Sequence, residues 1–344
     1  MSDLAEGNIL EVKGLKKFYP IEKGLFKKVV GNIRAVDNVN FKIKSSETLG
    51  LVGESGCGKT TTARAVLRAL EPTAGEIYFR TSDNNIVDMA KLNKKQLRKV
   101  RCDMQMIFQD PYSSLNPRMP VSEIVGEFLT AHGWNKRDTR KRVAELLELV
   151  GLDPKYMNRY PHAFSGGQRQ RLGIARALSL NPSLIVADEA VSALDVSVQA
   201  QILNLMKDLQ DKLGISYLFI AHDLSVVRYI CDKVAVMYVG KIVEIAKTDE
   251  LFVHPKHPYT SGLLEAIPDA DPHIEWKATL KGEVADPSKK SRGCVFEPRC
   301  KYSKDICKEK EPILKNTDSK TEHKAACHFA NELKLKNVVG ELSL

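Results

Sequence analysis

The sequence predicts an α/β fold built around a parallel sheet, and three apolar segments carry that prediction. Residues 49–52, 184–187 and 217–221 are short, continuous apolar runs, as expected of strands buried on both faces. The first run leads through a glycine-rich loop into residues 61–70, whose apolar positions repeat with helical spacing. Strands that alternate with helical segments indicate βαβ units, whose strands run parallel.

The loop after residues 49–52 has the spacing of a phosphate-binding motif. The pattern G-x-x-x-x-G-K-[ST] is matched by Gly53, Gly58, Lys59 and Thr60. Glycine backbone lets amide hydrogens point at phosphate oxygens, and the helix start adds partial positive charge. We expect Lys59 to reach the β and γ phosphates of a nucleotide and Thr60 to bind Mg²⁺. The alternative, a flexible turn with a solvent lysine, is disfavoured by the strand before the loop and the helix after it.

The nucleotide-binding residues expected in this loop are Gly53, Ser55, Gly56, Cys57, Gly58, Lys59, Thr60 and Thr61.

Polar residues follow the second and third predicted strands. In an open parallel sheet, ligands bind beyond the carboxyl ends of the strands. Asp188 is therefore expected in the Mg²⁺ shell, while Glu189 is expected to orient and activate a water. His222 follows the third strand, where it is placed to contact a γ-phosphate or the attacking water. An ordinary acidic loop and a structural histidine are the alternatives.

Composition limits the classes of protein to consider. At 344 residues, of which 43% are apolar, the chain is long enough for two or three domains and can bury a sizeable core. No run approaches the roughly 18 apolar residues that span a bilayer, and the first residues do not resemble a secretory signal, so we expect a cytoplasmic protein. The net charge of +9 permits a nucleic-acid or anionic-membrane partner, but scattered surface lysines are commoner, and no nucleic acid is expected.

A second phosphate-binding helix start lies between the predicted strands, in FSGGQ at residues 164–168. Ser165 and the amides of Gly166 and Gly167 begin a segment with helical spacing, and Gln168 completes the motif. The motif resembles the LSGGQ signature of ATP-binding cassette (ABC) ATPases. In that family the signature of one subunit closes over the nucleotide held by the glycine loop of another. The resemblance thus explains why one chain has two phosphate-binding helix starts.

Other family motifs occur in the same order along the chain. Gln109 matches the Q-loop glutamine, a γ-phosphate sensor and Mg²⁺ ligand, residues 192–195 match the D-loop, and His222 matches the switch histidine. Tyr19 stands where relatives stack an aromatic ring on adenine, although packing within a strand also explains it. Ala190 departs from the family, since many relatives have proline after the catalytic glutamate.

The resemblance divides the chain into four segments. The nucleotide-binding core, of the P-loop (RecA-like) type, is expected at residues 8–109 and 164–253. Residues 110–163 interrupt it with two helical patterns, at 121–133 and 139–152, and resemble the family's helical subdomain, which docks onto a membrane partner. A rigid lid is the alternative for this insertion. Residues 254–335 form a C-terminal extension.

Two sequence features narrow the family. The stretch HPYT followed by LLEAIP, within residues 254–268, resembles the extension of ATPases that serve oligopeptide, dipeptide and, in some branches, nickel importers. The insertion at residues 20–39 resembles the second of the two paralogous ATPases in such systems. For His254 and His257 a metal site is the alternative, but the neighbouring prolines suit a fixed linker better.

The extension also holds four cysteines in the spacing C-x5-C-x6-C-x19-C, namely Cys294, Cys300, Cys307 and Cys327. The spacing alone leaves zinc, an iron-sulfur cluster and unliganded thiols open, because it discriminates poorly between metals. In the family the pattern looks like a [4Fe-4S] site, so a cluster in a cysteine-rich extension is the expectation.

The resemblance implies an ATPase that powers uptake of di- or oligopeptides, with Glu189 as general base and Gln109 and His222 as sensors of the γ-phosphate. Its implied partners are a paralogous ABC ATPase in a heterodimer, two transmembrane permease subunits and an extracytoplasmic substrate-binding protein. The implied location is the cytoplasmic face of the membrane. An importer of nickel or another small solute is the alternative, and a soluble ABC ATPase acting on nucleic acid or ribosomes is less favoured.

Overall fold

The computed structural model describes residues 4–24, 28–110, 114–266, 280, 282–289, 291–317 and 322–336. The chain forms two compact units, each assembled from separate stretches of sequence. The first unit contains Met1–Leu10, Ile43–Glu47 and Tyr78–Ile220, and the second contains Glu11–Lys42, Thr48–Ile77 and Ala221–Leu344.

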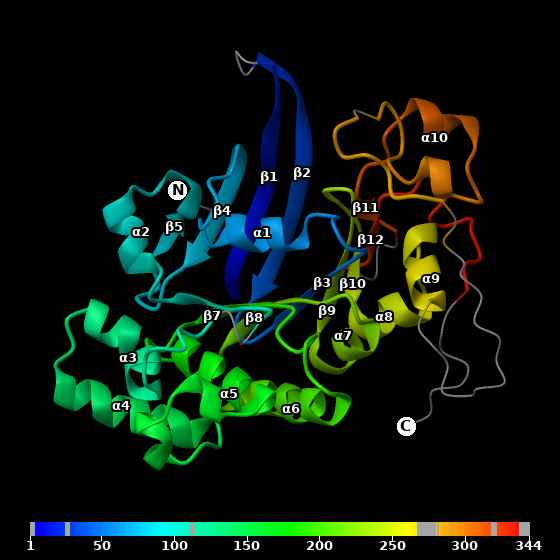
Figure 1. The fold of residues 1–344 in the computed structure, drawn as a ribbon. Helices are drawn as coiled ribbons and strands as arrows, with labels where there is room; N and C mark the ends of the chain where they lie inside the picture. Colours follow the sequence, from blue (N-terminus) through cyan, green and yellow to red (C-terminus); the bar gives the residue numbers. More distant parts are fainter. Residues whose placement is uncertain are drawn as a thin grey trace. The chain divides into compact units, whose positions relative to one another are not determined.

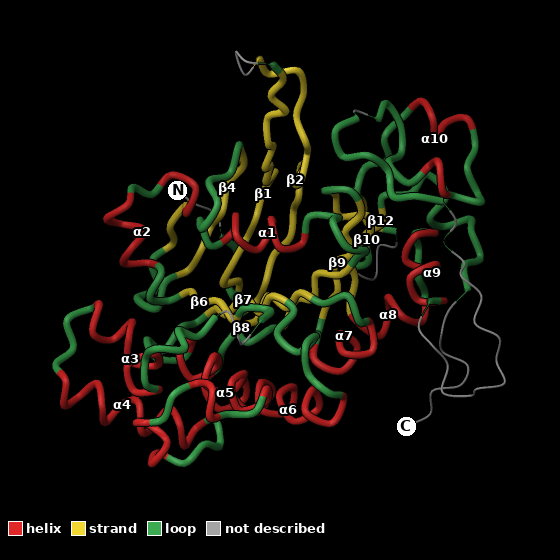
Figure 2. The backbone as a smooth tube through the Cα atoms, in the orientation of Figure 1, coloured by secondary structure: helices red, strands yellow, loops and turns green. Residues whose placement is uncertain are grey.

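The first unit is built on three parallel strands (Figure 2). Strand β7 (Leu184–Asp188) lies between β6 (Met104–Ile107) and β8 (Ser216–Ile220), with Ile107 opposite Ala187 and Asp188 opposite Ile220. Every residue of β7 and β8 is buried, which explains their continuous apolar sequences. Because the strands are parallel, their carboxyl ends lie at one edge of the sheet.

Four helices complete the core of the first unit: α3 (Val121–Ala131), α4 (Lys136–Leu149), α5 (Gly166–Ala177) and α6 (Val196–Leu213). Helix α3 packs against α4 and α5 (Figure 1), and α5 packs against α6 and β6. Gly126 of α3 permits the close approach of α4, since a Cβ there would lie 2.7 Å from Thr139 Cγ2. The apolar face of each helix is thereby removed from water.

The second unit contains the strand that precedes the glycine loop. Strand β3 (Thr48–Val52) runs parallel to β9 (Lys233–Tyr238), which pairs antiparallel with β10 (Lys241–Lys247). The C-terminal segment then continues this sheet. Its strand β12 (Lys324–Ala325) pairs antiparallel with β10, and β11 (Lys315–Asn316) pairs with β12.

The remaining elements are four strands, six helices and four short turns of 3-10 helix among the described residues. The strands are β1 (Asn8–Lys23), β2 (Lys28–Lys44), β4 (Ala74–Arg80) and β5 (Ile86–Asp88). The helices are α1 (Lys59–Val66), α2 (Lys94–Val100), α7 (Leu224–Ile230), α8 (Thr248–Val253), α9 (Pro258–Glu265) and α10 (Asp305–Glu309). Short 3-10 turns are η1 (Met89–Lys91), η2 (Pro154–Asn158), η3 (Pro161–Ala163) and η4 (Glu297–Arg299).

Helix boundaries differ from the predicted ones for local reasons. Helix α1 begins at Lys59 and is over by Arg68, whose φ of +54° is left-handed, so the predicted span of 61–70 was shifted. Helix α4 begins at Lys136 because the Asn135 side chain accepts a hydrogen bond from Asp138 N. Parts of the predicted features, at residues 25–27, 111–113 and 267–268, lie outside the described residues.

Within the described part of the chain, none of the helices combines the length and the apolar character needed to cross a membrane.

Candidate nucleotide site

The glycine loop connects β3 to α1 in the second unit, and two of its glycines are required by close backbone contacts. Gly53 has a φ of +149° and Gly58 a φ of +108°. A Cβ on Gly53 would lie 2.1 Å from Met237 O, and one on Gly58 would lie 2.1 Å from Ala35 O. Side chains at these positions would collide with backbone, so the loop keeps this shape only with glycine. A Cβ on Gly56 would meet nothing within 4 Å, so only its left-handed φ of +77° favours glycine there.

Lys59 is the first residue of α1 and is held back against the loop. Its side chain is buried, and Nζ donates hydrogen bonds to Gly53 O at 2.7 Å and to Glu54 O at 3.0 Å. No acidic residue lies in the first turn of α1, and Gly58 supplies no side-chain cap. The helix start therefore offers backbone donors and partial positive charge to an anion, with an ammonium group beside them.

The end of β7 carries the two predicted carboxylates. Asp188 is the last residue of the strand and is buried. Glu189 follows with a φ of +48°, a left-handed conformation uncommon for a residue with a side chain. The turn is fixed by Glu189 N, which donates to Ile220 O at 3.0 Å, and by Ser192 Oγ, which donates to Glu189 O at 3.0 Å. This backbone geometry turns the chain sharply at the carboxyl end of the sheet.

Gln109 and Glu189 are brought together at this edge. Gln109 lies just beyond β6, which is the neighbour of β7, and its Nε2 donates a hydrogen bond of 2.7 Å to Glu189 Oε2. The pairing of two parallel strands thus joins the predicted Q-loop residue to the predicted general base.

The signature segment forms the start of α5, as predicted. Ser165 is the N-cap: its hydroxyl accepts from Gln168 N at 3.3 Å, and Gln168 Oε1 accepts from Ser165 N at 3.1 Å. Gly167 is placed against α6, where a Cβ would lie 2.5 Å from Val198 Cγ1. This capping box holds the helix start with the first amides, including those of Gly166 and Gly167, at its end.

Two other predicted residues belong to the second unit. His222 is exposed in the loop after residue 220, and Tyr19 is half-buried on β1 with Lys17 Nζ 5.0 Å from the centre of its ring. Within the first unit, Ala190 is buried at the turn where many relatives have proline.

Two family models match the sequence. The model described as ABC transporter matches residues 36–192, and the model described as oligopeptide/dipeptide transporter, C-terminal region, matches residues 243–307. The chain is also 49% identical over 334 residues to the oligopeptide transport ATP-binding protein AppF of Bacillus subtilis, covering 96% of this chain and 99% of that protein. The chain belongs to the ATP-binding subunits of oligopeptide and dipeptide ABC transporters.

Further similarities support the family and confirm the predicted ABC ATPase fold. The dipeptide transport ATP-binding protein DppF of Haemophilus influenzae is 46% identical over 315 residues, which cover 91% of this chain and 94% of that protein. The dimeric ATP-binding cassette MJ0796, solved with ADP and Pi, has a TM-score of 0.60 and 30% identity, over 70% of this chain and 99% of its own. This ABC subunit is accordingly an ATPase.

The glycine loop of the ABC subunit is suited to ATP. Its donors are backbone amides and one ammonium group, the set that phosphate oxygens require, and the open space at Gly56 leaves the loop accessible. Thr60 in the second unit and Asp188 in the first each carry side-chain oxygen, the type of ligand that Mg²⁺ prefers.

The prediction of a [4Fe-4S] cluster was wrong. Cys294, Cys300, Cys307 and Cys327 do line one small cavity of about 20 Å³, together with Phe296. Among the residues that the structure describes, however, no group of three or more His, Cys, Asp or Glu side chains is arranged to hold a metal ion. The matched relatives are named as ATP-binding proteins without reference to iron.

The surroundings of Cys294, Cys300 and Cys327 favour the neutral, protonated form of their thiols. The thiolate is the metal ligand, and burial raises the pKa of Cys294 to about 12 and that of Cys327 to about 11. Burial likewise raises the pKa of Cys300. All four are free cysteines of the C-terminal segment; Cys307 is buried and the other three are half-buried.

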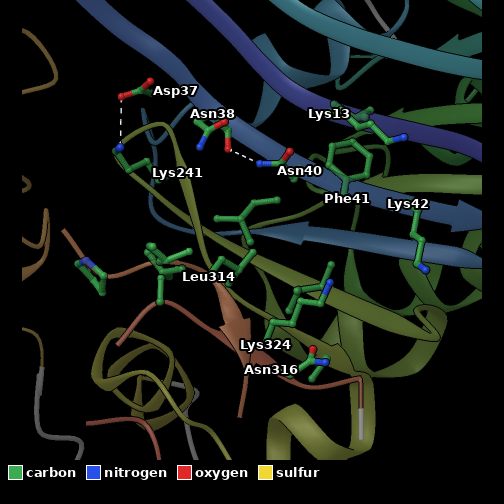
Figure 3. A pocket seen from close by; sticks show the side chains of 18 of the residues that line it. Lys13, Asp37, Asn38, Asn40, Phe41, Lys42, Lys241, Leu314, Asn316 and Lys324 are labelled. Atoms are coloured by element: carbon green, nitrogen blue, oxygen red, sulfur yellow. Dashed lines mark hydrogen bonds and ion pairs between the residues drawn. The ribbon is translucent and has the colours of Figure 1, made fainter. Parts of the chain in front are cut away.

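A larger cavity, of about 660 Å³, lies elsewhere in the second unit, between β1, β2, β10 and the C-terminal segment (Figure 3). Its lining includes Phe41, Lys42 and Lys324. At its rim Lys241 of β10 forms ion pairs with Asp37 at 3.2 Å and with Glu311 at 2.5 Å. The cavity thus marks where the C-terminal segment is attached to the sheets; its lining does not include the glycine loop.

Two residues that were not predicted contact the glycine loop. Arg299 Nη1 donates to Glu54 Oε2 at 2.6 Å, and Glu54 N donates to Tyr259 Oη at 2.9 Å. Both partners belong to the C-terminal segment, far along the chain, so no local motif signals them. The one sequence signal for such a contact is Glu54 itself, an acidic residue inside a phosphate-binding loop.

Proposed function

We propose that this ABC ATPase powers the uptake of di- or oligopeptides through a membrane permease. The observation that carries the proposal is the similarity to AppF, named as an oligopeptide transport ATP-binding protein, along 96% of the chain. The match of residues 243–307 to the C-terminal region of oligopeptide/dipeptide transporters supports the same substrate class.

In the second unit, the loop amides and Lys59 bind the phosphates of ATP, with Tyr19 stacking on adenine. The proposal is supported by the buried Lys59 ammonium, whose Nζ donates a hydrogen bond of 2.7 Å to Gly53 O. When ATP binds, Nζ donates to a phosphate oxygen in place of a loop carbonyl. His222 senses the γ-phosphate from the loop beyond residue 220.

In the first unit, Glu189 is the general base that accepts a proton from the attacking water. Its carboxylate is oriented by Gln109 through the bond of 2.7 Å, which supports this role. Mg²⁺, when bound, neutralises phosphate charge, and Thr60, Gln109 and Asp188 are the residues proposed to hold it. Ser165 and Gly167 act in trans, on ATP bound by another subunit.

The assembly proposed for this chain follows from the roles above. The helical subdomain at residues 110–163 docks onto the permease, and residues 254–335 form the C-terminal extension. The complete importer contains this chain, a paralogous ATPase, two permease subunits and an extracytoplasmic binding protein. This chain resembles the second of the two paralogous ATPases and lies peripherally at the cytoplasmic face of the membrane.

Reconstitution tests the proposal. The chain, its paralogue and the permease subunits are placed in vesicles with the binding protein, and ATP-dependent accumulation of labelled di- and oligopeptides is measured. Uptake with the wild type and none with Lys59→Ala is expected, because the variant lacks the phosphate-binding ammonium. Lys44→Ala, which alters an exposed lysine, is the matched control and should transport normally. Accumulation of nickel with no accumulation of any peptide would contradict the proposed substrate class.

A further inference from the structure

We infer that Arg299 and Tyr259 are positioning residues for the phosphate-binding loop, acting through Glu54. The inference rests on the proposed ATP-binding role of that loop. It assigns to the C-terminal segment a direct part in nucleotide affinity.

The ion pair between Arg299 and Glu54 has the geometry of a strong interaction. Nη1 lies 2.6 Å from one carboxylate oxygen and Nη2 lies 3.0 Å from the other, so the pair is bidentate. The Arg299 side chain is only 5% exposed and the Glu54 side chain 26% exposed, which limits screening by water. The guanidinium also lies over the ring of Tyr238 on β9, 5.8 Å from its centre. Arg299 is therefore fixed on two sides.

Tyr259 fixes the backbone of the same residue. Glu54 N donates to the Tyr259 hydroxyl at 2.9 Å, and Tyr259 is fully buried at the start of α9. Its ring packs against Tyr238 and Phe296, with centres 4.7 Å and 5.4 Å away. A hydroxyl anchored in this aromatic cluster holds one amide of the loop in a defined orientation.

Glu54 joins these contacts to the phosphate-binding lysine. The carbonyl of Glu54 accepts from Lys59 Nζ at 3.0 Å, while its side chain and amide are held by Arg299 and Tyr259. A movement of Glu54 therefore shifts a partner of Lys59.

The ion pair also has an electrostatic consequence. Glu54 places a carboxylate inside a loop that binds polyphosphate, and a carboxylate there repels the ligand unless it is neutralised. Arg299 supplies that neutralisation. Its removal leaves Glu54 without this cation, and ATP affinity falls.

The experiment measures the Kd of MgATP with a fluorescent analogue, using full-length chain. Arg299→Ala is expected to raise the Kd on the order of tenfold, since hydrogen bonds to charged groups are the strong ones. Arg299→Lys keeps the charge but not the bidentate geometry, so its Kd should lie between that of the wild type and that of Arg299→Ala. Arg292→Ala, which removes an exposed arginine of the same segment, is the matched control and should bind as the wild type does.

A double variant separates positioning from folding. Glu54→Gln combined with Arg299→Ala removes the repelling charge together with its partner, so much of the lost affinity should return. Tyr259→Phe should raise the KM for ATP while kcat is retained, because the hydrolytic groups are unchanged. An Arg299→Ala variant with wild-type Kd, or a double variant with no recovery, overturns the inference. A wild type that fails to bind ATP overturns instead the proposed function on which it rests.

Discussion

Gln109 Nε2 lies 2.7 Å from Glu189 Oε2, although the two residues are separated by 80 positions in the sequence. The bond joins the ends of β6 and β7, which are parallel neighbours. It gives Glu189 a fixed side-chain orientation to match its fixed backbone turn. The role proposed for Glu189 makes this relationship testable.

Glu189→Gln is expected to bind MgATP nearly as the wild type does but to hydrolyse it about 100-fold more slowly or worse. The amide has the size of the carboxylate but cannot accept the proton of water. Equilibrium binding and phosphate release measure the two effects. Glu148→Gln, at an exposed position of α4, is the control. Wild-type turnover in the Glu189 variant would remove Glu189 from its proposed role.

The glycine loop yields a prediction about stability and binding together. Gly58→Ala would place a Cβ 2.1 Å from Ala35 O at a φ of +108°. We expect a loss of about 2–3 kcal/mol in the free energy of unfolding, and loss of ATP binding. Gly173→Ala in α5 meets nothing within 4 Å and should be neutral or slightly stabilising. Chemical unfolding and nucleotide titration check both variants. Wild-type stability and wild-type ATP binding in Gly58→Ala would refute the steric argument.

The proposed action of Ser165 and Gly167 in trans predicts that the isolated chain is a poor ATPase. Adding the paralogous subunit should raise turnover about tenfold or more, since each site then gains donors for the phosphates. Phosphate release is measured for each chain alone and for the mixture, and the rates are compared. The heterodimer proposal fails if the isolated chain already hydrolyses ATP as fast as the complete complex.

The environment of His257 predicts a dependence of stability on pH. Burial lowers the pKa of His257 to about 3, and its Nδ1 accepts a hydrogen bond from Tyr259 N at 3.1 Å. In the unfolded chain this histidine takes up a proton below its ordinary pKa of 6.5, whereas the folded chain does not until about pH 3. The unfolded state thus binds more protons in this window, so stability is lost as pH falls from about 6.5 towards 3.

The expected slope from this residue is at most about 1.4 kcal/mol per pH unit. Urea unfolding at pH 7.5, 6.0 and 5.0 measures it. His257→Asn keeps a side-chain acceptor for the Tyr259 amide but does not titrate, so its slope should be smaller. His162→Asn, at an exposed position, should leave the slope unchanged. Equal slopes for wild type and His257→Asn would exclude His257 as the source.

Local sequence was sufficient to predict a parallel α/β fold and the elements that carry the site, and the resemblance of its motifs to those of ABC ATPases specified the fold. Continuous apolar runs indicate buried strands, as in β7. Capping patterns indicate helix starts, as at Ser165 and Gln168. The glycine loop was predictable because Gly53 and Gly58 lie where a Cβ would collide with backbone atoms, so glycine is needed at both positions. These signals depend on residues close together in the chain.

The tertiary structure decided how distant segments meet. Arg299 and Glu54 are separated by 245 positions, and their ion pair depends on the packing of the C-terminal segment against β9 and β10. The cysteine spacing likewise did not determine thiol geometry or ionisation, because both depend on the burial that packing produces. Sequence spacing specifies which groups are available, whereas distances and solvent exposure between remote segments are properties of the folded chain alone.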